Sequence, residues 1–421
     1  MLPNALSALE TAYQTFRRDV TRRVSHRADY AWLLSRPAAI VTDYLHLEDL
    51  GEKPYHQLNA LSARLSPAVW RRWVFPRILN QMFAIFRTLH LGPRGADEPT
   101  PEFLHSFVEG LRNEFLIASH GMHHVTFAEM GSFLSDSFFD FGAHFGFERD
   151  RYASVKAHHN TMSLMMVNML RPELKDHPLK WELALYLVTR SNWMDVVMPG
   201  YEAFALAFPE EINQLLDAPA RILGNLQGAP LVQLSAIRAR LEGPTQTILI
   251  ECDNCGEVVF DLFLAELLLE QGHTVIMAGK EAPIVNDVTA TEIAHLVSRY
   301  PQGVLREPLQ TGRLRVIGTG SAGIGKLLDR VSTEYRHAYQ QADILVLKGQ
   351  GNFHTMPFGV QTKKGFVPHP YQKPIISLMG LKSPIILRCM QSLYAPRLLP
   401  PMQSPVMMVF DPQNPATFPI K

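Results

Sequence analysis

Residues 247–269, TILIECDNCGEVVFDLFLAELLL, change character within a few positions. The first four are β-branched or apolar, which is typical of a buried parallel strand. Residues 258–269 are too long an apolar run for a second strand and predict a buried helix that ends before Gly272. Asp253 and Asn254 then lie in the loop at the carboxyl end of a strand, where open α/β sheets bind their ligands. This stretch predicts an α/β fold with a ligand site in that loop.

The overall composition excludes several classes of protein. The 421 residues carry 40 basic and 40 acidic side chains, so no net field favours nucleic acid or an anionic membrane surface. No apolar run reaches the roughly 20 residues that a membrane span requires, and the first residues lack a signal-peptide core. Three cysteines cannot form a disulfide framework, which favours a reducing compartment. We expect a cytoplasmic protein that binds neither nucleic acid nor membrane, and the oligomeric state stays open.

The periodicity of apolar residues changes once along the chain. Residues 1–240 are predicted to form an all-helical domain, with helical spacing at 102–118, 162–170 and 181–188. Residues 245–395 alternate short apolar runs with helical segments, the strands being expected at 247–250, 273–278, 314–318, 343–348 and 374–379. This alternation predicts a Rossmann-like three-layer α/β/α core with a mostly parallel sheet. Residues 396–421 are Pro-rich and are expected to form an irregular tail.

Two helix starts in the second half match the capping-box pattern. Asn254-x-x-Glu257 and Thr289-x-x-Glu292 each place an acceptor three residues before a glutamate. The second box implies that Asp287, two residues before it, lies at the mouth of the preceding strand. Asp287 is therefore expected at the same sheet edge as Asp253. Glu257 is predicted to complete its box, with a role as a catalytic base as the alternative.

Hard oxygen ligands and a lysine follow three of the predicted strands. Asp253-Asn254 and Asn286-Asp287 supply two carboxylates and amide oxygens, a set that suits Mg²⁺ or Mn²⁺ better than zinc. Lys348-Gly-Gln-Gly-Asn352 supplies a cation for phosphoryl oxygens, and Gly349 and Gly351 allow backbone N–H groups to approach a phosphate. Metal and lysine together could stabilise the charge of an in-line displacement at phosphorus.

Four motifs resemble, in order, those of the family once called domain of unknown function 89, the metal-dependent damage-control phosphatases. They are Asn192–Asp195 (NWMD), Asp253–Asp261 (DNCGEVVFD), Pro283–Thr289 (PIVNDVT) and Lys348–Asn352 (KGQGN). Leu387-Arg-Cys-Met resembles the end of the family's last core strand. The likeness extends from about residue 180 to residue 392.

The resemblance implies a divalent metal, Mg²⁺, Mn²⁺, Co²⁺ or Ni²⁺, on Asp253, Asn254 and Asp287. It implies hydrolysis of a phosphate monoester of a small metabolite, such as a sugar phosphate or a phosphopantetheine-like compound. The catalytic residues are expected to be Asp253, Glu257 and Lys348. The substrate-binding residues are expected to be Asn192, Asp195, Gly349, Gly351, Asn352 and His354.

The chain departs from the family pattern at His354, where the resemblance predicts a carboxylate after the aromatic residue. Two alternatives follow: a non-hydrolytic binding or regulatory member of the same fold, and an S-adenosylmethionine-dependent carboxyl methyltransferase. Cys252 and Cys255 also allow a minor redox interpretation. The glycine-rich run Gly318–Gly325 (GTGSAGIG) is interpreted as a turn that faces the substrate or helps to bind phosphate.

Overall fold

The structure, a computed structural model, describes part of the chain in detail. The described residues are 150, 152–196, 200–226, 229, 231–326, 331–356, 359–362, 365–368, 373–382 and 404–411. Most of the predicted N-terminal helical domain lies outside these residues, as does Leu387, so those two predictions stay predictions.

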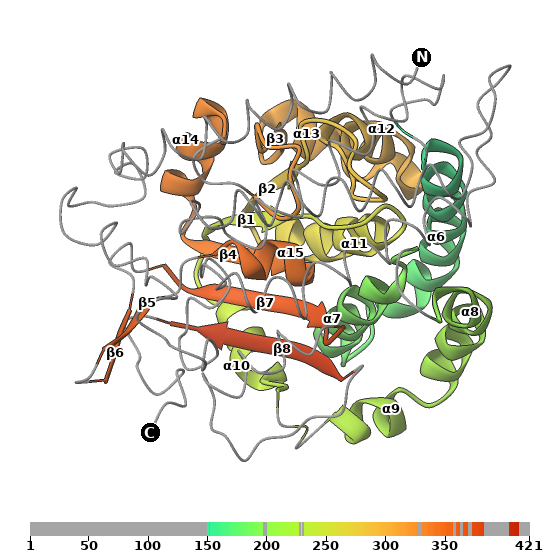
Figure 1. Cartoon of the computed structure of the whole chain (residues 1–421). Helices are drawn as coiled ribbons and strands as arrows, with labels where there is room; N and C mark the ends of the chain where they lie inside the picture. The colour runs from blue at the N-terminus through green and yellow to red at the C-terminus, as the bar shows by residue number, and fades with distance from the viewer. Residues whose placement is uncertain are drawn as a thin grey trace, which may run out of the picture.

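A mostly parallel sheet forms the centre of the described residues (Figure 1). Its strands are β1 (Thr247–Glu251), β2 (Thr274–Gly279), β3 (Leu314–Gly318), β4 (Ile344–Lys348), β7 (Ile375–Gly380) and β8 (Pro405–Phe410). They lie in the order β3-β2-β1-β4-β7-β8, and all neighbours are parallel except the antiparallel pair β7–β8. The first five agree with the strands predicted from sequence to within one residue at each end. The prediction of an α/β core with a mostly parallel sheet is confirmed.

The strand order places a topological switch between β1 and β4. From β1 the chain proceeds through β2 to β3 on one side, and β4 and β7 lie on the other. Ligands bind at such a point because the two flanking loops separate there. The register pairs Glu251 with Leu347, so Asp253 and Lys348 leave the sheet at the same edge.

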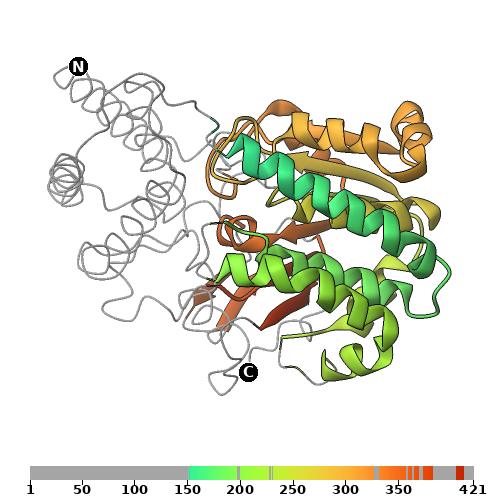
Figure 2. The ribbon, with the colours of Figure 1, turned by 90° about the vertical axis from the view of Figure 1, so that its right-hand side faces the viewer.

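Helices cover both faces of this sheet. They are α6 (Ala153–Leu174), α7 (Lys180–Arg190), α8 (Tyr201–Asp217), α9 (Pro219–Leu226), α10 (Leu234–Leu241), α11 (Glu257–Glu270), α12 (Ala290–Arg299), α13 (Arg306–Thr311), α14 (Thr333–Gln341) and α15 (Gly349–His354), with short 3-10 turns η5 (Ser191–Trp193) and η6 (Pro301–Gly303). Helices α7, α11 and α12 share a core with one face, while α14 and α15 contact β1, β3, β4 and β7 from the other. Figure 2 shows α6 and the helices after it running along the near side of the sheet.

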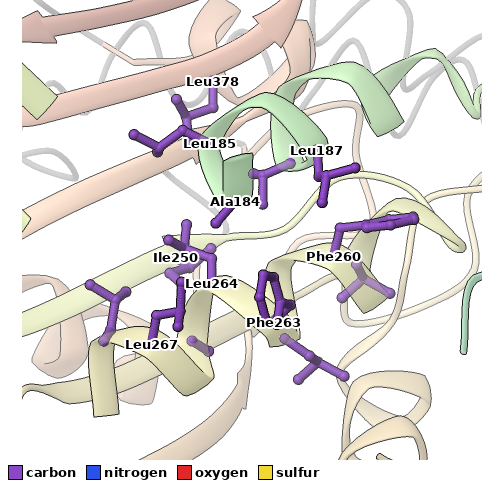
Figure 3. Close-up of a cluster of buried hydrophobic side chains, with 14 of the residues drawn as sticks. Ala184, Leu185, Leu187, Ile250, Phe260, Phe263, Leu264, Leu267 and Leu378 are labelled. Carbon is purple, nitrogen blue, oxygen red and sulfur yellow. The ribbon is translucent and has the colours of Figure 1, made fainter. Parts of the chain in front are cut away.

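The larger core joins α7 and α11 to the sheet. Figure 3 shows apolar side chains from these helices meeting those of β1 and β7. Those labelled there are Ala184, Leu185, Leu187, Ile250, Phe260, Phe263, Leu264, Leu267 and Leu378. Every residue of α11 except Glu270 is buried, which explains why residues 258–269 have no polar face.

Two features were not predicted. Pro405–Phe410 were expected to belong to an irregular tail, but they form strand β8, with Val406–Phe410 buried. The six-residue run is apolar throughout, and the prolines on its N-terminal side obscured it. The hairpin β5 (Gly359–Thr362) and β6 (Gly365–Pro368) forms a separate two-stranded sheet.

Among the described residues, none of the helices is long and apolar enough to cross a membrane.

Removing the ring of Phe260 should destabilise the fold strongly. The side chain is fully buried in α11 and packs edge-on against Phe208, with ring centroids 5.7 Å apart. Phe260→Ala should lower the free energy of unfolding by about 3–5 kcal/mol, because it leaves a cavity between helices. Leu206→Ala, at an 84% exposed position of α8, should change it by less than about 0.5 kcal/mol. Urea denaturation measures both, and equal effects would contradict this description of the core.

Candidate functional site

Asp253, Asn254 and Asp287 lie side by side at the carboxyl edge of the sheet. The carbonyl of Asp253 accepts the N–H of Val288 at 2.8 Å, and Asn254 and Asp287 form an isolated antiparallel bridge. The loops after β1 and β2 are thus hydrogen-bonded to each other. The second predicted capping box, Thr289 with Glu292, is present and starts α12 directly after Asp287.

A buried amide network orients the first two of these side chains. Asn192 Nδ2 donates to Asp253 Oδ2 and to Glu257 Oε2, both at 2.9 Å, and Asn192 Oδ1 accepts the N–H of Gly380 at 3.0 Å. Asn254 Nδ2 donates to the same two oxygens at 2.8 and 3.0 Å. Asn192 comes from η5, so the helical layer contributes directly to the site. Its amide is fully used by protein groups, which makes it a residue that positions Asp253.

Glu257 forms no capping box with Asn254, and that prediction is wrong. The N-cap of α11 is Gly256, whose φ of 81° L side chains rarely adopt, and it has no side-chain cap bond. The carboxylate of Glu257 instead accepts from Lys348 Nζ as well as from the two amides. An ion pair with a lysine 91 positions further along the chain takes the place of the local cap.

Lys348 is surrounded by protein acceptors. Its ammonium contacts Glu257, lies 2.9 Å from Asp261 Oδ1 and donates to the carbonyl of Val188 at 2.9 Å. Lys348, Glu257 and Asp261 all have 0% exposure. The ammonium therefore has two hydrogen-bond acceptors and one further ion-pair partner, all of them protein groups.

The pKa values follow from this arrangement. Burial acts to lower the pKa of Lys348, but Asp261 and Glu257 raise it overall. Burial acts to raise the pKa of Glu257, but Lys348 and Lys382 together hold it below its ordinary value. Burial raises the pKa of Asp261 to about 7. At neutral pH Glu257 is thus ionised, while Asp261 is close to its titration point.

The candidate metal ligands themselves are crowded by negative charge. Burial raises the pKa of Asp253 well above its ordinary range, and the charges of Glu257 and Asp287 raise it further. Burial also raises the pKa of Asp287 to about 6, against the opposing effect of Lys280. A divalent cation between Asp253 and Asp287 would offset this repulsion.

The donor set fits such an ion. Both N–H bonds to the carboxylate of Asp253 reach Oδ2, and the amide N–H of Asn254 turns inward. Asp253 Oδ1 and Asn254 Oδ1 consequently have no hydrogen bond from the described residues. Two carboxylates and one amide oxygen are ligands that hard cations prefer. Within the described part of the chain, no group of three or more His, Cys, Asp or Glu is placed to hold a metal, so the amide oxygen is needed to complete the set.

The run after β4 starts helix α15. Gly349 has a φ of 71°, and a Cβ there would overlap the carboxylate of Asp253, so only glycine fits. Gly351 packs against Gly325. Asn352 Nδ2 donates to the carbonyls of Glu251, Cys252 and Lys348 at 2.9–3.1 Å and therefore joins β1 to β4. The side chain of His354 lies outside the described part of the structure.

Sequence reasoning missed Lys382, two residues after β7. Its Nζ donates to Asp195 Oδ2 at 3.0 Å and lies 6.0 Å from the centre of the Trp193 ring. Its charge lowers the pKa of Asp253 and Glu257, so it lies within electrostatic reach of the candidate metal ligands. Asp195 was predicted as a site residue and is near the same ligands, because its charge raises the pKa of Asp287. The available signal was a lone lysine after a predicted parallel strand.

Cys252 and Cys255 are both buried as free thiols. Burial raises the pKa of each thiol well above its ordinary value. Reactive cysteines are exposed and have a lowered pKa. The minor redox interpretation therefore gains no support.

The raised pKa of Asp261 predicts a pH-dependent stability in the metal-free protein. A carboxyl that holds its proton up to about pH 7 when folded, but only to about pH 4 when unfolded, stabilises the fold less as pH rises between those values. The loss is on the order of 4 kcal/mol for this shift. Asp261→Asn should flatten the dependence, which urea unfolding at several pH values measures. Parallel curves for wild type and Asp261→Asn would contradict the assignment.

Comparisons with known proteins agree with these features. Residues 94–393 match the damage-control phosphatase ARMT1-like domain. A damage-control phosphatase of Pyrococcus horikoshii is 29% identical over 209 residues, which cover 49% of this chain and 63% of that protein. A damage-control phosphatase of Archaeoglobus fulgidus is 23% identical over 55% of this chain and 73% of that protein. The alignment thus spans less than two thirds of the Pyrococcus relative.

The fold is also similar to a solved structure. A crystal structure of a domain-of-unknown-function-89 protein from Pyrococcus horikoshii superposes with a TM-score of 0.56 at 21% identity. The superposition covers 80% of this chain and 97% of that one. The family match extends over more than half of the 421 residues and includes every candidate site residue. The chain belongs to the damage-control phosphatase ARMT1-like domain family.

Proposed function

We propose that this protein is a divalent-metal-dependent phosphatase that hydrolyses a phosphate monoester of a small metabolite. The observation that carries the proposal is the adjacency of Asp253, Asn254 and Asp287 at the carboxyl edge of the sheet, in a fold of a phosphatase family. Asp253 and Asn254 each keep an oxygen without a hydrogen bond from the described residues. When bound there, a divalent ion supplies Lewis-acid stabilisation of the phosphoryl charge.

Lys348 and Lys382 have different tasks in this proposal. Lys348 donates to Glu257 and Val188 and forms an ion pair with Asp261, so it holds those carboxylates in place behind the metal ligands. Lys382 has Asp195 as its only hydrogen-bonding partner among the described residues. Its remaining N–H groups can therefore donate to phosphate oxygens. Direct phosphate contact, which the sequence assigned to Lys348, falls to Lys382 in this proposal.

Glu257 is assigned a positioning role for a similar reason. It accepts from Asn192, Asn254 and Lys348, and its lowered pKa makes it a weak base. Asp253 has one oxygen engaged by two amides and the other uncommitted, and it is the catalytic residue most directly exposed to substrate in this arrangement. Gly349 lets the backbone after β4 approach that carboxylate.

Asp253→Ala should abolish metal-dependent phosphate release without unfolding the protein. Phosphate release is measured from metabolite phosphates and p-nitrophenyl phosphate, after EDTA treatment and addition of Mg²⁺, Mn²⁺, Co²⁺ or Ni²⁺. Asp176→Ala, at an exposed carboxylate remote from the sheet edge, serves as the control and should retain full activity. An active Asp253→Ala variant would refute the assignment. No release from any substrate, with metal bound, would favour the non-hydrolytic alternative.

Lys382→Met should weaken substrate binding, whereas Lys348→Met should lower the stability of the fold. Loss of Lys382 should raise KM by roughly 10- to 100-fold, the value of one or two charge-assisted hydrogen bonds, and leave the fold intact. Loss of Lys348 should destabilise the fold by about 3–5 kcal/mol, because two carboxylates stay buried without a cation. Steady-state kinetics and thermal unfolding separate the two outcomes. A Lys348→Met variant of normal stability but raised KM would reverse the two roles.

A further inference from the structure

Lys280 is a buried lysine whose position is fixed by the segment that carries Asp287. It follows β2 directly and is 2% exposed. Its N–H donates to the carbonyl of Val288 at 2.9 Å, and its own carbonyl accepts the N–H of Ala290 at 3.1 Å. The backbone of Lys280 is therefore hydrogen-bonded to the residues that directly follow Asp287.

The ammonium of Lys280 has partners on two different segments. It lies 3.4 Å from Asp287 Oδ2, and it donates to the carbonyl of Gly325. A buried ammonium needs such partners, because removal from water is costly unless charge and hydrogen bonds replace it. One of its partners is a candidate metal ligand, and the other belongs to the glycine-rich run after β3.

The glycine-rich run Gly318–Gly325 and the residue after it, Lys326, make further contacts with the site. Lys326 pairs with Glu251, two residues before Asp253, and its N–H donates to Thr355 Oγ1 at 3.0 Å. Gly325 has a φ of 67°, and a Cβ there would overlap the carbonyl of Gly351. The run is thus fixed against β1 and α15. The loop after β2 contacts it through the ammonium of Lys280 and through Glu281, whose N–H donates to the carbonyl of Ser321 at 3.3 Å and whose Oε2 accepts the N–H of Gly320 at 3.2 Å.

We propose that Lys280 is a positioning residue that couples the metal ligand Asp287 to the glycine-rich run, so that metal binding and the order of this run depend on each other. The inference rests on the proposed function, since it takes Asp253, Asn254 and Asp287 as the metal site. By holding Oδ2 of Asp287, Lys280 leaves Oδ1 to face the cation. Metal binding then tightens the contact with Asp287 and, through the same ammonium, the contact with Gly325.

Charge alone predicts the opposite effect of removing Lys280. A positive side chain close to a cation site repels the cation, so a lysine without a positioning role would weaken metal binding, and its loss would strengthen it. A lysine that orients the ligand has the reverse effect, because a carboxylate that can rotate binds metal less well. The sign of the change in metal affinity therefore separates the two explanations.

The test compares wild type, Lys280→Met and Lys280→Arg as full-length proteins. Isothermal titration with Mn²⁺ alone gives the Kd, and hydrogen exchange of residues 318–326 with and without Mn²⁺ reports the order of the run. Lys280→Met should raise the Kd by roughly 10- to 100-fold, the usual effect of losing a partner of a metal ligand. It should also abolish the Mn²⁺-dependent protection. Lys280→Arg, which keeps the charge and the donors, should recover most of both.

A matched control separates this coupling from general destabilisation. Arg171 is another buried cation, paired with Glu266 at 2.6–2.8 Å between α6 and α11 and remote from the site. Arg171→Met should lower thermal stability and leave the Mn²⁺ Kd unchanged. If Lys280→Met does not fold, Gly325→Ala disturbs the same link from the side of the run and should weaken Mn²⁺ binding.

Unchanged or tighter Mn²⁺ binding in a folded Lys280→Met protein would overturn the coupling. The proposed function would survive that result if wild type binds Mn²⁺ and Asp253→Ala does not. A wild-type protein that binds no Mn²⁺ would overturn both.

Discussion

Burial of Glu257 and Asp261 within helix α11 depends chiefly on the ammonium of Lys348, which contacts both carboxylates. Three charged groups away from water would otherwise cost more than the surrounding apolar contacts return. Lys348 ends β4, and the two carboxylates belong to the first turns of α11. This interaction therefore joins strand β4 to helix α11. The amides of Asn192 and Asn254 attach to the same carboxylate, Glu257. The geometry of the candidate metal ligands therefore depends on an ion cluster that itself faces protein.

The three lysines of the site have different roles. Lys348 is enclosed, Lys280 joins Asp287 to the glycine-rich run, and Lys382 is held by a single carboxylate beside the ligands. Among the described residues, Lys382 has the fewest acceptors of the three and so keeps the most N–H groups for an anion. A phosphate at this edge would meet the carboxylate and amide oxygens that suit a cation, together with the ammonium of Lys382, whose one hydrogen-bonding partner among the described residues is Asp195. Such an arrangement stabilises a phosphoryl group during displacement. The assignment of phosphate binding to Lys382 therefore follows from the N–H groups that the other two lysines already donate to protein acceptors.

Local sequence predicted the parallel strands well, because each is a short apolar run bounded by turn residues, as in β1 and β3. It also located Asp253 and Asp287 at one edge, since parallel strands end together. It failed where a distant partner outweighed a local pattern: Glu257 left the expected capping box for Lys348. Lys382 carried no motif, and its importance arises only from the neighbours that the fold brings to it. The apolar strand β8 was missed because its prolines suggested an irregular tail.

The central claim is that Asp253, Asn254 and Asp287 hold one divalent cation, with the buried charges behind them serving to orient these three. Anomalous diffraction at the manganese edge, from crystals of the full chain grown with Mn²⁺, tests it most directly. The account predicts a single strong peak within coordination distance of one oxygen from each of the three side chains, with Lys348 still enclosed by Glu257 and Asp261. Manganese bound elsewhere, or no peak while the three side chains keep their present arrangement, would contradict it.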